Sequence, residues 1–108
     1  MENLRAKTHN LKLQNVNDAM DIIGSGLPGC IFTQEDIDPN FFDLKNRIAG
    51  EVFQKLTTYN FPIAIVLPDD HGLGERITEL IRDHKNHNCV RFFTSIEQAE
   101  SWLKTIII

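Results

Sequence analysis

The apolar run from Phe61 to Leu67 constrains the fold of this chain more than any other feature. Pro62 interrupts the run near its start, and the remainder is rich in β-branched side chains. Successive side chains of a strand point to opposite faces, so an unbroken apolar run makes both faces apolar. A strand of this kind is covered on two sides, which is typical of the centre of a parallel sheet.

Strand and helix patterns alternate along the rest of the chain. Further strands are predicted at residues 11–14, 30–33 and 89–94, and helices at 16–23, 41–59, 73–85 and 95–103. This alternation predicts an α/β fold with the order βαβαβαβα, in which helices flank a mostly parallel four-stranded sheet. The crossovers between parallel strands are expected to be right-handed.

The longest helical pattern begins at Phe41 or Asp43 and ends near Tyr59. Gly50 lies in its middle, where a glycine costs a helix about 1 kcal/mol. Glycine at such a position usually marks the close approach of another backbone. We therefore expect close packing on Gly50, either within the chain or across an intermolecular contact.

The chain has 108 residues, which is the length of one domain. A domain of this size buries roughly two-thirds of its unfolded surface. Residues 1–8 show no hydrophobic periodicity and are predicted to form a loose N-terminal arm. Residues 9–108 are predicted to form a single α/β domain.

Composition and charge exclude several classes of partner. Hydrophobic residues make up 42% of the chain and charged residues 24%, as in soluble globular proteins. The net charge of −4 argues against nucleic acid or an anionic membrane surface as a partner. No apolar run approaches the roughly 20 residues that span a bilayer, and no signal-peptide pattern is present. The predicted location is the cytoplasm, where Cys30 and Cys89 stay reduced.

A polar loop follows the predicted central strand. Ligands of open α/β sheets bind beyond the carboxyl ends of the strands. A histidine beside carboxylates can act as a general acid and base, and glycines let a backbone approach an anion at a helix N-terminus. The same residue types are also ordinary turn formers, so a purely structural turn is the alternative. The candidate ligand loop consists of Asp69, Asp70, His71, Gly72 and Gly74.

A second group of polar residues, His84, His87 and Cys89, raises the question of a zinc site. Zinc sites need more well-spaced ligands than this group offers, and a histidine pair at a helix C-terminus is favoured by the helix dipole alone. No Ser, Cys or Lys lies in a recognisable nucleophile motif. We therefore expect no metal, no cofactor and no catalytic residue.

Several blocks of sequence together extend over about four-fifths of the chain, namely residues 18–23, 41–45, 49–56 with Tyr59, 63–66 and 99–103. They resemble a bacterial family known as domain of unknown function 4180. The Phe-Asp and Ala-Gly-Glu blocks, in this order and spacing, carry most of the resemblance. The family in turn is similar to STAS-like folds, small α/β modules that act by docking onto partner proteins.

The resemblance implies a docking surface where a strand meets the long helix. Some STAS-like modules carry a phosphorylatable Ser or Thr there, and the corresponding segment is Asp43 to Arg47. The family pattern has a threonine and a glycine where this chain has Asn46 and Arg47, so the switch hydroxyl is missing and docking is expected to be constitutive. The candidate interaction surface consists of Asp43, Lys45, Asn46, Arg47 and Glu51.

Two functions from different classes remain open. One is a non-catalytic STAS-like interaction or regulatory module, whose partner is another protein or a second copy of the chain. The other is a small enzyme or small-ligand binder that uses the Asp69-Asp70-His71 loop. An open pocket with His71 bonded to a carboxylate favours the second, and an exposed turn without a cavity favours the first.

Overall fold

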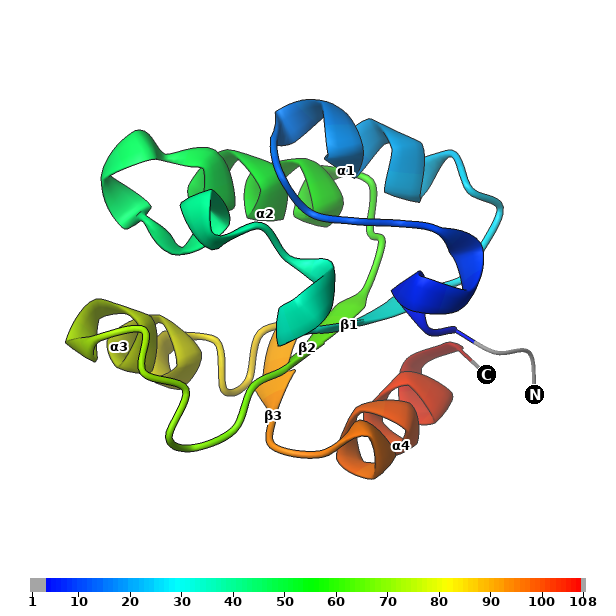
Figure 1. Cartoon of the computed structure of the whole chain (residues 1–108). Coiled ribbons are helices and arrows are strands. Elements are labelled where there is room, and N and C mark those ends of the chain that lie inside the picture. Colours follow the sequence, from blue (N-terminus) through cyan, green and yellow to red (C-terminus); the bar gives the residue numbers. More distant parts are fainter. Residues whose placement is uncertain (1–3, 108) are drawn as a thin grey trace.

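The computed structural model describes residues 4–107, which form an α/β fold (Figure 1). The described residues contain three strands and four α-helices. The strands are β1 (Cys30–Thr33), β2 (Ile63–Val66) and β3 (Val90–Phe93). The helices are α1 (Val16–Ile23), α2 (Ile48–Thr58), α3 (Glu75–Asp83) and α4 (Ile96–Ile107). No helix among them is long and apolar enough to cross a membrane.

The three strands form one parallel sheet in the order β1-β2-β3. Ile63 at the start of β2 pairs with Cys30 of β1 on one side and with Val90 of β3 on the other. The apolar run therefore supplies the central strand, as predicted. Ile63 and its two pairing partners, Cys30 and Val90, are completely buried.

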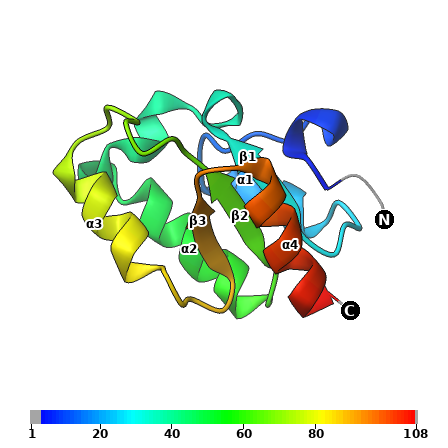
Figure 2. The same ribbon diagram turned by 90° about the horizontal axis from the view of Figure 1, so that it is seen from below.

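Helices cover both faces of the sheet. Figure 1 shows α1 and α2 above the strands, and the view from below in Figure 2 shows α4 crossing the opposite face. Phe32 and Ile65 face α1 and α2 in a first core, whereas Ile31 and Ala64 face α4 in a second core. Trp102 of α4 belongs to that second core.

The prediction of a fourth strand at residues 11–14 is wrong. Leu13 forms an isolated parallel bridge with Ile37, in which its N–H donates to Asp36 O at 3.1 Å and its O accepts from Asp38 N at 2.9 Å. The pairing stops there because the next N–H on that side of the chain, that of Asn15, donates to the Asp18 carboxylate at 3.1 Å. A capping side chain of α1 therefore takes the bond that a strand would need.

The prediction of a loose arm over residues 1–8 does not hold for the described part of that segment. Leu4 O accepts a 2.8 Å hydrogen bond from Ile31 N, and Arg5 forms a parallel bridge with Ile31. Leu4 is 5% exposed and Ala6 is completely buried. A single bridge and a short 3-10 helix (Ala6–His9) hold the segment. Neither element produces the repeating pattern of apolar residues by which a strand or an α-helix is recognised in a sequence.

The long helix begins later than the sequence predicts. Residues 39–46 form two short 3-10 turns, and α2 starts at Ile48. Asn46 Oδ1 accepts the Ile48 N–H at 2.9 Å, and Asn46 Nδ2 donates to Asn40 O at 2.7 Å. Arg47, with φ of 65°, breaks the helical path between the turns and α2.

The predicted close packing on Gly50 within the chain is also wrong. Gly50 is exposed, and a Cβ added there would meet no atom within 4 Å. We expect Gly50→Ala to stabilise the protein by about 0.5–1 kcal/mol, because alanine restricts the unfolded chain and favours the helix. Denaturant unfolding measures this change, and a lower midpoint for the variant would mean that Gly50 contacts something.

Candidate functional site

Two hollows lie along the edge of the sheet where the parallel strands end. The first, of about 570 Å³, lies between the ends of β1 and β2, and the second, of about 380 Å³, between the ends of β2 and β3. Pro68, directly after β2, lines both. This edge is where open α/β sheets bind their ligands.

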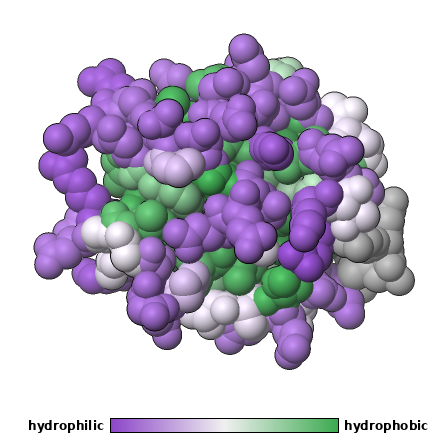
Figure 3. Space-filling view, in the orientation of Figure 1, coloured by the Kyte–Doolittle hydropathy of each residue, from purple (hydrophilic) through white to green (hydrophobic). Residues whose placement is uncertain are grey.

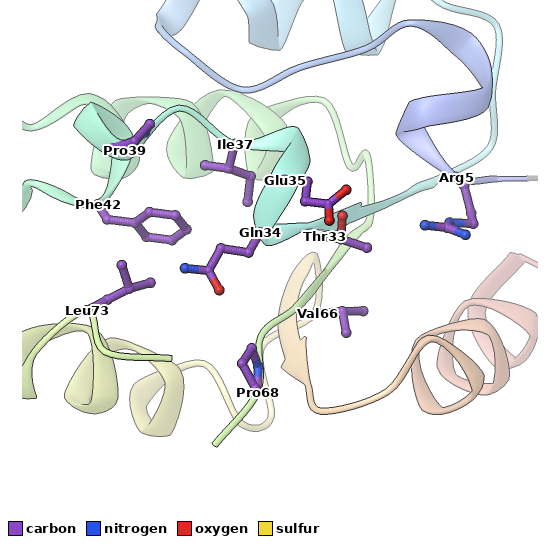
Figure 4. A pocket seen from close by; sticks show the side chains of 10 residues that line it. All are labelled: Arg5, Thr33, Gln34, Glu35, Ile37, Pro39, Phe42, Val66, Pro68 and Leu73. Atoms are coloured by element: carbon purple, nitrogen blue, oxygen red, sulfur yellow. The ribbon is translucent and has the colours of Figure 1, made fainter. Parts of the chain in front are cut away.

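The first hollow has mostly apolar walls that come from separate segments (Figure 4). Its apolar lining residues are Ile37, Pro39, Phe42, Val66, Pro68 and Leu73. Figure 3 shows hydrophobic residues gathered in the middle of this face, with hydrophilic residues around them. A cavity of this size and character fits a small organic molecule, whose sites are usually about 300–1,000 Å³.

Polar side chains lie at the β1 side of the first hollow. They are Arg5, Thr33, Gln34 and Glu35. The chain turns sharply after β1 because Asp36 Oδ2 accepts both the Thr33 N–H, at 2.8 Å, and the Thr33 hydroxyl, at 2.9 Å. That turn places Gln34 directly at the strand end, with its amide pointing into the hollow (Figure 4).

The second hollow receives part of the candidate ligand loop. Asp69 and His71 line it, while Asp70, Gly72 and Gly74 are not among its lining residues. Gly72 and Gly74 have φ of +70° and +95°, and a Cβ added at either would meet no atom within 4 Å. These glycines are thus required by the left-handed backbone of the turn. No crowding by a neighbouring group demands them.

His71 is held by its own loop. Its Nδ1 accepts the Leu73 N–H at 2.9 Å, which assigns the neutral ring a proton on Nε2. Nε2 then donates to the Thr78 hydroxyl at 3.3 Å. Among the described residues, no carboxylate is bonded to His71, so the site combines an open cavity with a histidine that lacks the carboxylate partner of an acid–base pair.

The candidate interaction surface is exposed in the structure. Asp43, Lys45, Asn46, Arg47 and Glu51 are all exposed around the turn that precedes α2 and on its first turn. Asp43 Oδ1 accepts the Lys45 N–H at 3.2 Å, and Asn46 caps Ile48. The structure therefore brings the five residues together and gives two of them a local structural role.

The two histidines considered as zinc ligands have hydrogen-bond partners in the backbone. His84 Nδ1 donates to Leu80 O at 2.8 Å, and His87 Nδ1 accepts the N–H groups of Cys89 and Val90, both at 3.0 Å. Within residues 4–107, no three His, Cys, Asp or Glu side chains lie close enough together to hold a metal ion. Burial raises the pKa of the Cys30 thiol to about 12, which keeps it protonated and unreactive at neutral pH.

We expect the protein to lose stability as the pH falls through the titration of His87. Partial burial, and then the nearby His84 and Arg91, lower the pKa of His87 from 6.5. A base with a lowered pKa in the folded state contributes stability that is complete above pH 6.5 and lost as the pH falls through the folded-state pKa. A proton on Nδ1 would also break the bonds to Cys89 and Val90 at the start of β3.

His87→Asn is the matched control, because its Oδ1 can accept the same N–H groups without titrating. Unfolding free energies measured from about pH 7.5 to about pH 5 compare the two proteins across the range where histidine titrates. The wild type should lose more stability than the variant. Parallel curves would contradict this assignment.

A family model described as "Domain of unknown function (DUF4180)" matches residues 2–103, nearly the whole chain. The chain belongs to the DUF4180 family. No curated protein and no solved structure matches it. The resemblance seen in the sequence blocks is therefore confirmed at the level of this family.

Sequence analysis missed the first hollow of this DUF4180 domain. Its walls come from segments that are far apart in sequence, and none of them carries a motif. One signal was available: Gln34 directly follows a predicted strand, as Asp69 nearly does. The rule that ligands bind at carboxyl strand ends applies to both positions.

Proposed function

We propose that this DUF4180 domain is a non-catalytic binding module and that the first hollow is its ligand site. The observation that carries the proposal is an apolar cavity of about 570 Å³ at the carboxyl ends of β1 and β2. The cavity offers a large contact area for the apolar body of a ligand, and its few polar side chains can orient that ligand.

The hydrogen bonding of the reactive side chains supports a binding role over a catalytic one. His71 uses both ring nitrogens within its own loop and helix α3, and the Cys30 thiol is buried. A general base needs a free nitrogen within reach of the proton that it removes. The second hollow, with Asp69 and His71, is accordingly assigned to binding as well.

A fragment screen by NMR with methyl-labelled protein tests the proposal. Compounds that bind should shift the methyl signals of Ile37, Val66 and Leu73, which come from three separate segments around the first hollow. Leu73→Trp should abolish the shifts of Ile37 and Val66 by filling the hollow. Met20→Trp is the control, because Met20 is an exposed residue of α1 outside the hollow. Hits that shift methyl groups scattered over the protein would overturn the proposal.

The exposed surface before α2 favours a second function, docking to a protein partner as in STAS-like modules. Phe42 lines the first hollow and Asp43, the next residue, belongs to the docking surface. A ligand in the hollow therefore lies close to that surface. Lys45→Glu combined with Arg47→Glu should abolish binding to a partner protein or to a second copy. Lys55→Glu, further along α2, should not. Equal losses in both variants would contradict docking at this surface.

A further inference from the structure

We propose that the ligand of the first hollow is a small, uncharged, planar molecule with an N–H group beside a C=O group, as in a lactam, and that Gln34 recognises this edge. The inference rests on the proposed function and names the ligand class for the same site. It depends on where the Gln34 amide lies, what it bonds to and what surrounds it.

The Gln34 side chain has unused hydrogen-bonding capacity. Gln34 is half-buried, and no hydrogen bond within residues 4–107 involves its side-chain amide. Figure 4 shows this amide pointing into the space between Phe42 and Pro68. No group in the described part of the chain competes for this amide, so a ligand can pair with both its N–H₂ and its C=O.

The chemistry of a primary amide selects the complementary edge. The amide presents a donor N–H₂ and an acceptor C=O side by side in one plane. A lactam presents a matching acceptor and donor, so two parallel hydrogen bonds form. A carboxylate has only acceptors at neutral pH and would place one of them against the Gln34 carbonyl oxygen.

The surroundings of Gln34 favour an uncharged ring. Phe42, Leu73 and Pro68 are the apolar residues around its amide, and a flat ring can contact all three. The charged residues of the lining, Arg5 and Glu35, lie toward Thr33, at the other end of the hollow (Figure 4). The end that holds Gln34 is therefore apolar apart from the amide itself.

Titrations with two probes test the inference. The probes are 2-quinolone, which has the lactam edge, and N-methyl-2-quinolone, which lacks its N–H donor. The methyl signals of Ile37, Val66 and Leu73 report binding at the first hollow. The wild type should bind 2-quinolone about threefold to tenfold more tightly, the usual gain from one additional hydrogen bond.

The variants separate the role of Gln34 from the rest of the site. Gln34→Leu should bind both probes equally, and Gln34→Glu should bind 2-quinolone more weakly than the wild type does. Gln54→Leu, an exposed glutamine of α2 outside the hollow, should keep the full preference. Because Gln34→Glu remains polar at a half-buried position, it keeps the test decisive should Gln34→Leu fail to fold.

The outcomes distinguish failure of the ligand class from failure of the site. If the probes bind equally to the wild type, or if the preference persists in Gln34→Leu, the lactam assignment is wrong while the binding site stands. If neither probe nor any screened fragment shifts the three methyl signals, the proposed function is itself wrong.

Discussion

Leu13→Ala is expected to destabilise the protein by about 2–5 kcal/mol, the usual cost of deleting a buried leucine side chain. Leu13 is completely buried in the first core, although the sequence around it is polar. Both of its backbone polar groups are hydrogen-bonded, the N–H to Asp36 O and the carbonyl O to Asp38 N. The backbone therefore cannot shift freely to fill the cavity that the substitution leaves.

Denaturant unfolding measures the effect, with Lys12→Ala as the control. Lys12 is the exposed neighbour in the same segment, and its substitution should change the unfolding free energy by less than about 0.5 kcal/mol. The loss at Leu13 should also weaken ligand binding, because the bridge partner Ile37 lines the first hollow. Equal unfolding midpoints for the two variants would mean that Leu13 lies outside the core.

Leu4→Ala is expected to cost about 2–4 kcal/mol of unfolding free energy, again as a large-to-small substitution at a buried position. Leu4 is 5% exposed and packs in the second core with Trp102 and Leu103 of α4. A loose arm would give almost no change, so this variant tests the docking of the N-terminal segment directly.

Lys7→Ala serves as the matched control for Leu4, because Lys7 is exposed in the 3-10 helix that follows. Hydrogen exchange adds a second measurement. The Ile31 amide, which donates to Leu4 O, should exchange faster in Leu4→Ala than in Lys7→Ala. If both the unfolding free energy and the exchange rate of the Ile31 amide stay unchanged in Leu4→Ala, the N-terminal segment is a loose arm.

The positions of the three strands could be predicted from the sequence. The strands at residues 30–33, 63–66 and 90–93 lie within the predicted ranges. For β2 the reason is that its apolar run has to be covered on both sides. Asn15 caps α1, since its Oδ1 accepts the Asp18 N–H at 3.3 Å.

Prediction from sequence failed where one side chain redirects the backbone. The alternating pattern at Leu11 and Leu13 is that of a strand, but the Asp18 carboxylate accepts the Asn15 N–H that would continue the pairing. The long helical pattern from Phe41 continues through residues that the structure holds in 3-10 turns, because Asn46 caps Ile48 and Arg47 adopts a left-handed conformation. Neither choice is visible in hydrophobic periodicity.

The candidate site was predictable in its location but not in its composition. Asp69 and His71 do lie at a hollow on the predicted edge of the sheet. The larger hollow depends on Gln34, Phe42 and Leu73, which only tertiary packing brings together. Neither a motif nor hydrophobic periodicity indicates that these three residues are neighbours.

The second core has a consequence for synthesis of the protein on the ribosome. It joins Leu4 to Ala99, Trp102 and Leu103 of α4. Ile31 and Ala64 contribute to it from the face of the sheet that α4 covers. The first core can assemble as soon as β3 has emerged, but this face stays open until α4 has left the exit tunnel. The nascent chain therefore exposes this apolar face of the sheet until α4 has emerged, and a chaperone that binds exposed apolar surface would act during that interval.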